Sequence, residues 1–261
     1  MNRIQNAFDN KKAFIGFITA GDPSLDKTEE FILEMEKAGA ALVEIGIPFS
    51  DPIAEGPVIQ EANLRALSAG CTTDKIFDMV AKLRKKTQIP LAFMAYANSL
   101  YKYGYDRFCK RCAEVGIDGL IIPDMPFEEK YILSTPGYNI DSGNLMNKWL
   151  QENPELDGIM CVTDDIAYYL YRELEKIGKR GVRDTITTDV GQIVDMIRQV
   201  TDVPTAVGFG INKPEQVHQY TQIADGAIVG SAIVRLVAQY GEQAGPKIYE
   251  YVSEMVGGLA E

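Results

Sequence analysis

Short apolar runs rich in β-branched and aromatic residues alternate along this chain with stretches whose apolar residues repeat about every 3.6 positions. The runs have the length of buried strands, and they lie at 13–19, 42–46, 91–95, 119–123, 205–208 and 226–229. The helical stretches lie at 25–38, 74–86, 105–115, 190–200, 214–222, 234–240 and 246–255. Strand and helix alternating in this way predict an α/β fold with a parallel sheet.

The length of 261 residues permits either two small domains or one barrel of about 250 residues. Six strands are clear outside the middle of the chain, and two more between 131 and 180 would complete a (β/α)8 TIM barrel, closed or distorted. Because no stretch is rich in the residues of a linker, we expect a single domain over 1–261.

The middle of the chain departs from this regular spacing. Another apolar run, 131–135, begins only eight residues after Pro123, which is too close for an ordinary parallel crossover. Either 128–134 is a shortened helix, or 131–135 is a strand reached without its helix. A helix at 142–153, a strand at 158–163 and a helix at 165–179 are expected to follow.

Composition excludes several classes of protein. With 37 acidic and 26 basic residues, the net charge of -11 argues against a nucleic-acid partner. No apolar run reaches the length of a membrane span, and the N-terminus is too polar for a signal peptide. The four scattered cysteines favour reduced thiols and a cytoplasmic location. Cys109 and Cys112 form a C-x-x-C within a helical pattern, and with no second pair nearby we expect no metal site.

Glu44 stands out because it interrupts the apolar run 42–46. Strand alternation turns it away from the helices and into the barrel interior, where burial would raise its pKa and allow proton transfer near neutral pH. The alternative is a strand-end glutamate that is solvated or paired to a buried lysine. Asp51 and Glu55 follow in a proline-rich loop and would by themselves be surface charges.

Glycines follow the last two predicted strands, as Gly208 and Gly210 after one and Gly230 and Ser231 after the next. Barrels often bind phosphate with main-chain amides of these loops, and we therefore expect a phosphate-containing small-molecule ligand. The alternative is two turns that require glycine for a positive φ.

Four motifs resemble the tryptophan synthase alpha subunit family: FITAGDP at 17–23, EIGIPFSDP at 44–52, MAYAN at 94–98 and VGFGI at 207–211. The resemblance covers about 1–130 and 181–261. It implies a (β/α)8 barrel that cleaves indole-3-glycerol phosphate to indole and glyceraldehyde 3-phosphate without a cofactor. It also implies that a beta subunit receives the indole.

The resemblance assigns roles to individual residues. Glu44 stands at the proton-transfer glutamate, and Glu55 at an aspartate that accepts the indole N–H bond. The phosphate-binding positions correspond to Gly181, Gly210, Gly230 and Ser231. The positions in loops that touch the beta subunit correspond to Pro48, Asp51 and Asn98.

Between about 131 and 180 the chain instead resembles the sugar-binding domain of lactose-repressor-type regulators and periplasmic binding proteins, as in NLMNKWLQENPELDGIMCVTDD at 144–165. This resemblance implies an engineered chimera, with a flavodoxin-like β-α-β-α fragment in the barrel wall replacing the region from the fourth helix to the sixth strand. The family's indole-pocket tyrosine and most of its closing loop are absent with the replaced segment. We therefore expect strongly reduced activity; the alternative is a catalytically silent scaffold that retains only phosphate binding.

Overall fold

The computed structural model describes residues 3–9, 11–52, 55–124, 190–198, 202–208 and 210–260. The chain divides into two compact units, one formed by 1–123 and 204–261 and the other by 124–203. The predictions for 131–180, namely two further strands and the foreign β-α-β-α fragment, lie outside the described residues. Gly181 lies outside them as well.

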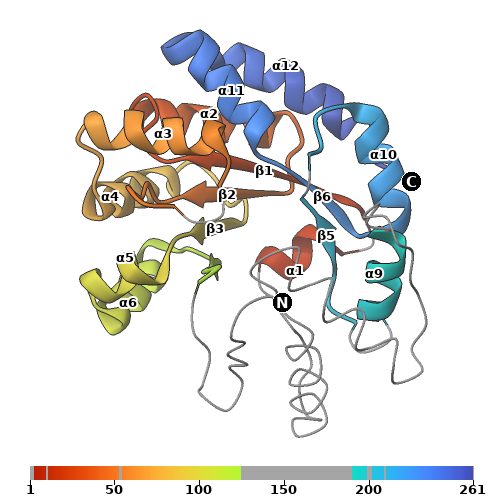
Figure 1. Cartoon of the computed structure of the whole chain (residues 1–261), viewed down its shortest axis with the longest axis horizontal. Helices are drawn as coiled ribbons and strands as arrows, with labels where there is room; N and C mark the ends of the chain where they lie inside the picture. The colour runs from red at the N-terminus through yellow and green to blue at the C-terminus, as the bar shows by residue number, and fades with distance from the viewer. Residues whose placement is uncertain are drawn as a thin grey trace, which may run out of the picture. The chain divides into compact units, whose positions relative to one another are not determined.

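Six parallel strands of the first unit form one sheet (Figure 1). They are β1 (Ala13–Thr19), β2 (Leu42–Gly46), β3 (Leu91–Met94), β4 (Gly119–Ile121), β5 (Ala206–Val207) and β6 (Gly226–Val229). Their order, β4-β3-β2-β1-β6-β5, places the first strand beside the last, as in the cyclic strand order of a barrel. All six predicted strands are confirmed, and β1, β2 and β6 have the predicted bounds to the residue.

Helices follow the strands and cover the outside of the sheet (Figure 1). They are α2 (Leu25–Lys37), α3 (Pro57–Ser68), α4 (Thr73–Leu83), α5 (Ala97–Tyr103), α6 (Tyr105–Val115), α10 (Pro214–Ile223), α11 (Ser231–Tyr240) and α12 (Ala244–Val256), with a 3-10 turn η2 (Gly241–Gln243). α12 packs against α2 and α11, and α11 against α3. A further helix, α9 (Val190–Arg198), belongs to the second unit. No helix in the described ranges is long and apolar enough to cross a membrane.

Three helices were not predicted: α1 (Arg3–Ala7), α3 and α5. α3 buries Ile59, Ala62 and Ala66, a stripe of mostly small residues that gives only a weak apolar periodicity. α1 and α5 have 5 and 7 residues, too few for periodicity to show. The other helices lie within three residues of their predicted bounds.

The two faces of the sheet carry different contacts. Ala13, Ile15, Leu42 and Ala92 form one buried cluster on the inner face, and Ile4 and Phe8 pack against it. On the other face, a Cβ at Gly16 would meet Met35 of α2 and Ile233 of α11. Because side chains alternate along a strand, Glu44 shares the inner face with Leu42.

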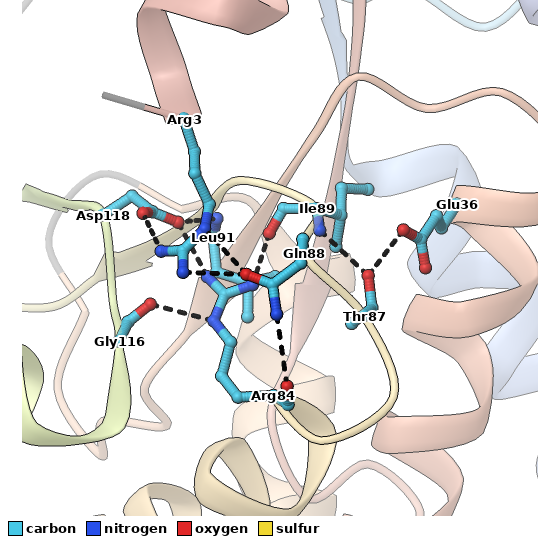
Figure 2. Close-up of polar contacts among 9 residues, drawn as sticks. All are labelled: Arg3, Glu36, Arg84, Thr87, Gln88, Ile89, Leu91, Gly116 and Asp118. Carbon is cyan, nitrogen blue, oxygen red and sulfur yellow. Dashed lines mark hydrogen bonds and ion pairs between the residues drawn. The ribbon is translucent and has the colours of Figure 1, made fainter. Parts of the chain in front are cut away.

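An ion cluster surrounds the segment that leads into β4 (Figure 2). Asp118 accepts hydrogen bonds from Arg3 Nη1 and Arg84 Nη2, both at 2.7 Å, and from the Leu91 amide at 2.9 Å. The side chains of Arg84 and Asp118 are only 10% and 7% exposed. Arg84 also donates hydrogen bonds to the Gly116 and Ile89 carbonyls at 2.9 and 2.5 Å. Asp118 therefore neutralises the charge of the guanidinium group, and the two carbonyls accept hydrogen bonds from its remaining N–H groups. This cluster lies at the amino ends of the strands, the end of a barrel associated with stability.

Candidate active site

Glu44 lies buried at the centre of β2. On β2 its register partners are Phe17 of β1 and Ala92 of β3, and it is 8% exposed. Burial raises its pKa from 4.5 to about 7. None of the described residues donates a hydrogen bond to its carboxylate or forms an ion pair with it, so the alternative of a lysine-paired glutamate is not found there. The predicted inward position and raised pKa are confirmed.

Phe17 forms an apolar wall beside Glu44. A Cβ at Gly46 would lie 2.6 Å from Phe17 Cζ, and one at Gly230 would lie 3.3 Å from Phe17 Cβ. Phe17 therefore occupies the space that glycine leaves on both neighbouring strands, which lowers the polarity around the carboxyl group. Sequence reasoning assigned Phe17 no role. It lies two positions after Ile15 and four after Ala13 on the same strand, a spacing that indicates an inward-facing side chain.

Glu55 lies just before α3 and is half-buried. Its carbonyl oxygen accepts a hydrogen bond from Gln60 Nε2 at 2.7 Å, and its carboxylate accepts one from the hydroxyl of Tyr96. Tyr96 follows β3, whose end pairs with that of β2 through the Ile47 amide and the Met94 carbonyl, 2.8 Å apart. Glu55 is therefore a bonded carboxylate and not a free surface charge.

Tyr96 is a residue that sequence reasoning missed, although it lies within a motif that carried the resemblance. It is 4% exposed, and its ring centroid lies 5.1 Å from that of Phe49. The available signal was an aromatic residue two positions after β3, in the segment that follows the carboxyl end of that strand.

The three residues assigned to a partner interface occupy different kinds of structure. Pro48 is half-buried and Asp51 is exposed, and both lie in the loop after β2 as expected. Asn98, in contrast, was expected in a loop but lies in α5, exposed on its first turn. The reason is that the helix starts directly after Tyr96, whose carbonyl accepts bonds from the amides of Ser99 and Leu100.

Of the glycines assigned to phosphate, Gly210 lies three residues after β5 and Gly230 directly after β6, and these two strands pair with each other. Gly230 precedes α11 with a φ of -116°, and Ser231 is the exposed first residue of that helix. A positive φ therefore does not explain Gly230, whereas Gly210 has a φ of 66° and fits that alternative. The first amides of a helix lack acceptors within it, which leaves those at the start of α11 suited to bind an anion.

No group of three or more histidine, cysteine, aspartate or glutamate residues within the described part of the chain could hold a metal ion. Cys109 is exposed on α6, and Cys112 is buried with its pKa raised to about 12, mainly by burial. Such a thiol is a poor source of the thiolate that metal binding or nucleophilic chemistry needs.

Comparisons with known proteins agree on one family. The chain matches the family model of the tryptophan synthase alpha chain over residues 4–258, a range that includes 131–180. The tryptophan synthase alpha chain of Lacticaseibacillus casei is 40% identical over 257 residues, covering 98% of this chain and 94% of that protein. That of Lactiplantibacillus plantarum is 41% identical over 241 residues, covering 92% and 90%.

Solved structures show the same fold. The tryptophan synthase alpha chain of Legionella pneumophila superposes with a TM-score of 0.71 at 28% identity, covering 99% of this chain and 97% of that one. A chain of the tryptophan synthase complex of Pyrococcus furiosus gives 0.69 at 26% identity, covering 95% and 99%. The architecture is therefore a TIM-barrel-like α/β fold.

Proposed function

Because the chain belongs to the tryptophan synthase alpha chain family, we propose that it cleaves indole-3-glycerol phosphate to indole and glyceraldehyde 3-phosphate. The observation that carries the proposal is Glu44, a buried carboxyl group with a pKa of about 7 that lies two residues before the carboxyl end of β2. That end is where TIM barrels place their active sites. A carboxyl group half-protonated at neutral pH can both donate and accept a proton.

The proposed reaction is a retro-aldol cleavage that moves one proton. Ring carbon C3 is protonated, and the hydroxyl on the attached side-chain carbon loses its proton. The carbon–carbon bond then breaks, its electrons return to the ring, and the side-chain carbon becomes the aldehyde. Protonated Glu44 supplies the acid, and its carboxylate is the base that takes up the hydroxyl proton.

Glu55 has the second role in this proposal. Protonation at C3 makes the ring a cationic indolenine whose N–H is a strong donor. A carboxylate that accepts this hydrogen bond stabilises the cation as it forms. The ring would lie against Phe17, which contacts the strands on both sides of β1.

The phosphate group is proposed to bind at Gly210, Gly230 and Ser231, with Gly181 as a further contact. The pairing of β5 with β6 and the first amides of α11 support this placement. Titration with inorganic phosphate should show binding at millimolar concentrations, and no binding would contradict it.

The decisive experiment is a steady-state assay of indole release by the unmodified protein and by Glu44→Gln, which keeps the size of the side chain but cannot transfer a proton. We expect the substitution to abolish turnover. Turnover that survives it would reject Glu44 as the acid and base.

A beta subunit is the proposed protein partner, since a related solved structure is a tryptophan synthase complex. Pro48, Asp51 and Asn98 are the proposed contacts. Adding a beta subunit should raise indole turnover, and Asp51→Ala, at an exposed loop position, should weaken that effect. Equal stimulation of both proteins would exclude Asp51 from the interface.

We propose separately that residues 131–180 are a segment from the sugar-binding family and that the chain remains a single domain. We propose that turnover is low as a consequence. The support is their local resemblance and their departure from regular strand spacing. Loss of a closing loop would admit water, which weakens electrostatic stabilisation at both carboxylates. Turnover equal to that of the Lacticaseibacillus casei relative would contradict low activity, and release of a stable fragment of about 50 residues by protease would contradict the single domain.

A further inference from the structure

The hydroxyl of Tyr96, which follows β3, donates a hydrogen bond to the carboxylate of Glu55, which precedes α3. The two residues are 41 positions apart in the sequence. We propose that Tyr96 is a positioning residue: its hydroxyl engages Oε2 of Glu55, so that Oε1 is presented to the indole N–H. The inference rests on the proposed function and adds to it a residue that does not itself contact the reacting atoms.

The tyrosine is the fixed member of this pair. It is 4% exposed, and its ring lies tilted by 31° against that of Phe49. Its carbonyl accepts hydrogen bonds from the amides of Ser99 at 3.0 Å and Leu100 at 3.4 Å, as the N-cap of α5. Backbone and ring are thus both held, and the hydroxyl has a defined position.

Glu55 is the adjustable member. Among the described residues, Gln60 restrains its backbone through the 2.7 Å hydrogen bond from Nε2 to the Glu55 carbonyl, and the Glu55 side chain is half-buried. A glutamate has one more rotatable bond than the aspartate that the family carries at this position. Fixing that bond costs conformational entropy, and an unrestrained carboxylate would spend most of its time away from the productive orientation.

The hydrogen bond to Tyr96 compensates for that extra freedom. A hydrogen bond to an ionised group shifts an equilibrium by about 10-fold or more. An aspartate at position 55 is one methylene shorter, so with the same backbone its carboxylate would lie farther from the Tyr96 hydroxyl. The contribution of Tyr96 should therefore depend on the length of the side chain at position 55.

A double-substitution cycle tests this dependence. Tyr96→Phe keeps the ring against Phe49 and removes only the hydroxyl, and we expect it to lower kcat by about 10-fold. In the background of Glu55→Asp, the same substitution should change kcat by less than about 2-fold. The matched control is Tyr101→Phe, which removes the same hydroxyl from a residue of α5 that is 73% exposed and should leave kcat unchanged.

The outcomes separate this inference from the proposed function. If Glu44→Gln abolishes cleavage and Tyr96→Phe has no effect, the function stands and Tyr96 is not a positioning residue. An equal loss in both backgrounds would mean that Tyr96 acts through packing and would also overturn the inference. Absence of cleavage in the unmodified protein would count against the function instead.

A readout without activity tests the bond itself. With tyrosine labelled by 13C at Cζ, the Tyr96 resonance is assigned by its loss in Tyr96→Phe. Glu55→Gln should shift that resonance, because an amide replaces the charged acceptor, while the Tyr101 resonance stays in place. A Tyr96 resonance that does not move would overturn the pairing whether or not the protein cleaves its substrate.

Discussion

Replacing Glu44 by glutamine should stabilise the folded protein at neutral and alkaline pH while removing its acid–base group. The glutamate is 8% exposed, and burial raises its pKa from 4.5 to about 7. Glutamine has nearly the same shape and carries no charge. The substitution therefore removes the cost of burying an ionised carboxylate and changes packing little.

The sign and size of the change in the free energy of unfolding follow from proton linkage. The folded state holds its proton up to about pH 7, whereas the unfolded chain loses it near pH 4.5. The stability that Glu44 contributes is therefore fully present below pH 4.5 and is lost as pH rises through 7. Each pKa unit corresponds to about 1.4 kcal/mol, so the loss approaches about 3 kcal/mol at alkaline pH.

Urea unfolding between pH 4.5 and 8 measures this difference. The free energy of unfolding of Glu44→Gln, minus that of the unmodified protein, should rise by about 3 kcal/mol across the range. Glu242→Gln, at an exposed position on η2, is the control and should give a flat difference. A flat difference for Glu44→Gln would refute the argument from burial.

Three further predictions concern stability. Asp118→Ala should lower the free energy of unfolding by about 3–5 kcal/mol in urea, because it leaves the 10% exposed side chain of Arg84 as an uncompensated buried charge. Gly46→Ala should cost about 1–3 kcal/mol and reduce indole release, because its methyl group would lie 2.6 Å from Phe17 Cζ. Thr19→Val should be neutral or stabilising in thermal unfolding, because the buried hydroxyl it removes has no hydrogen-bond partner among the described residues.

The first two of these predictions each have a matched control. Asp74→Ala breaks an ion pair whose two side chains are 63% and 66% exposed, and should cost much less than Asp118→Ala. Gly56→Ala places a methyl group with no atom of the described part of the chain within 4 Å and should be tolerated in the folded state. The reasoning for Asp118 would be contradicted if Asp118→Ala destabilised the protein no more than Asp74→Ala. The reasoning for Gly46 would be contradicted if Gly46→Ala cost as little stability as Gly56→Ala. A clearly destabilising Thr19→Val would contradict the reasoning for Thr19.

Local sequence patterns predicted the bounds of β1, β2 and β6 because these strands are largely buried on both faces. Buried strands such as β1 and β6 require nearly unbroken apolar runs, and turn residues mark their ends. The same local rule placed Glu44 inside, since alternation from Leu42 allows only one orientation. α3 escaped prediction because alanines on its buried side weaken the periodic signal.

The sequence by itself determined the alternation of strands and helices, the inward carboxyl group of Glu44 and the resemblance that leads to the family. Only the tertiary structure decided that Tyr96 bonds to Glu55 and that Phe17 lies between Gly46 and Gly230. The physical reason is distance along the chain. Alternation and periodicity act over a few residues, whereas these contacts join segments far apart in the sequence and exist only once the strands have paired.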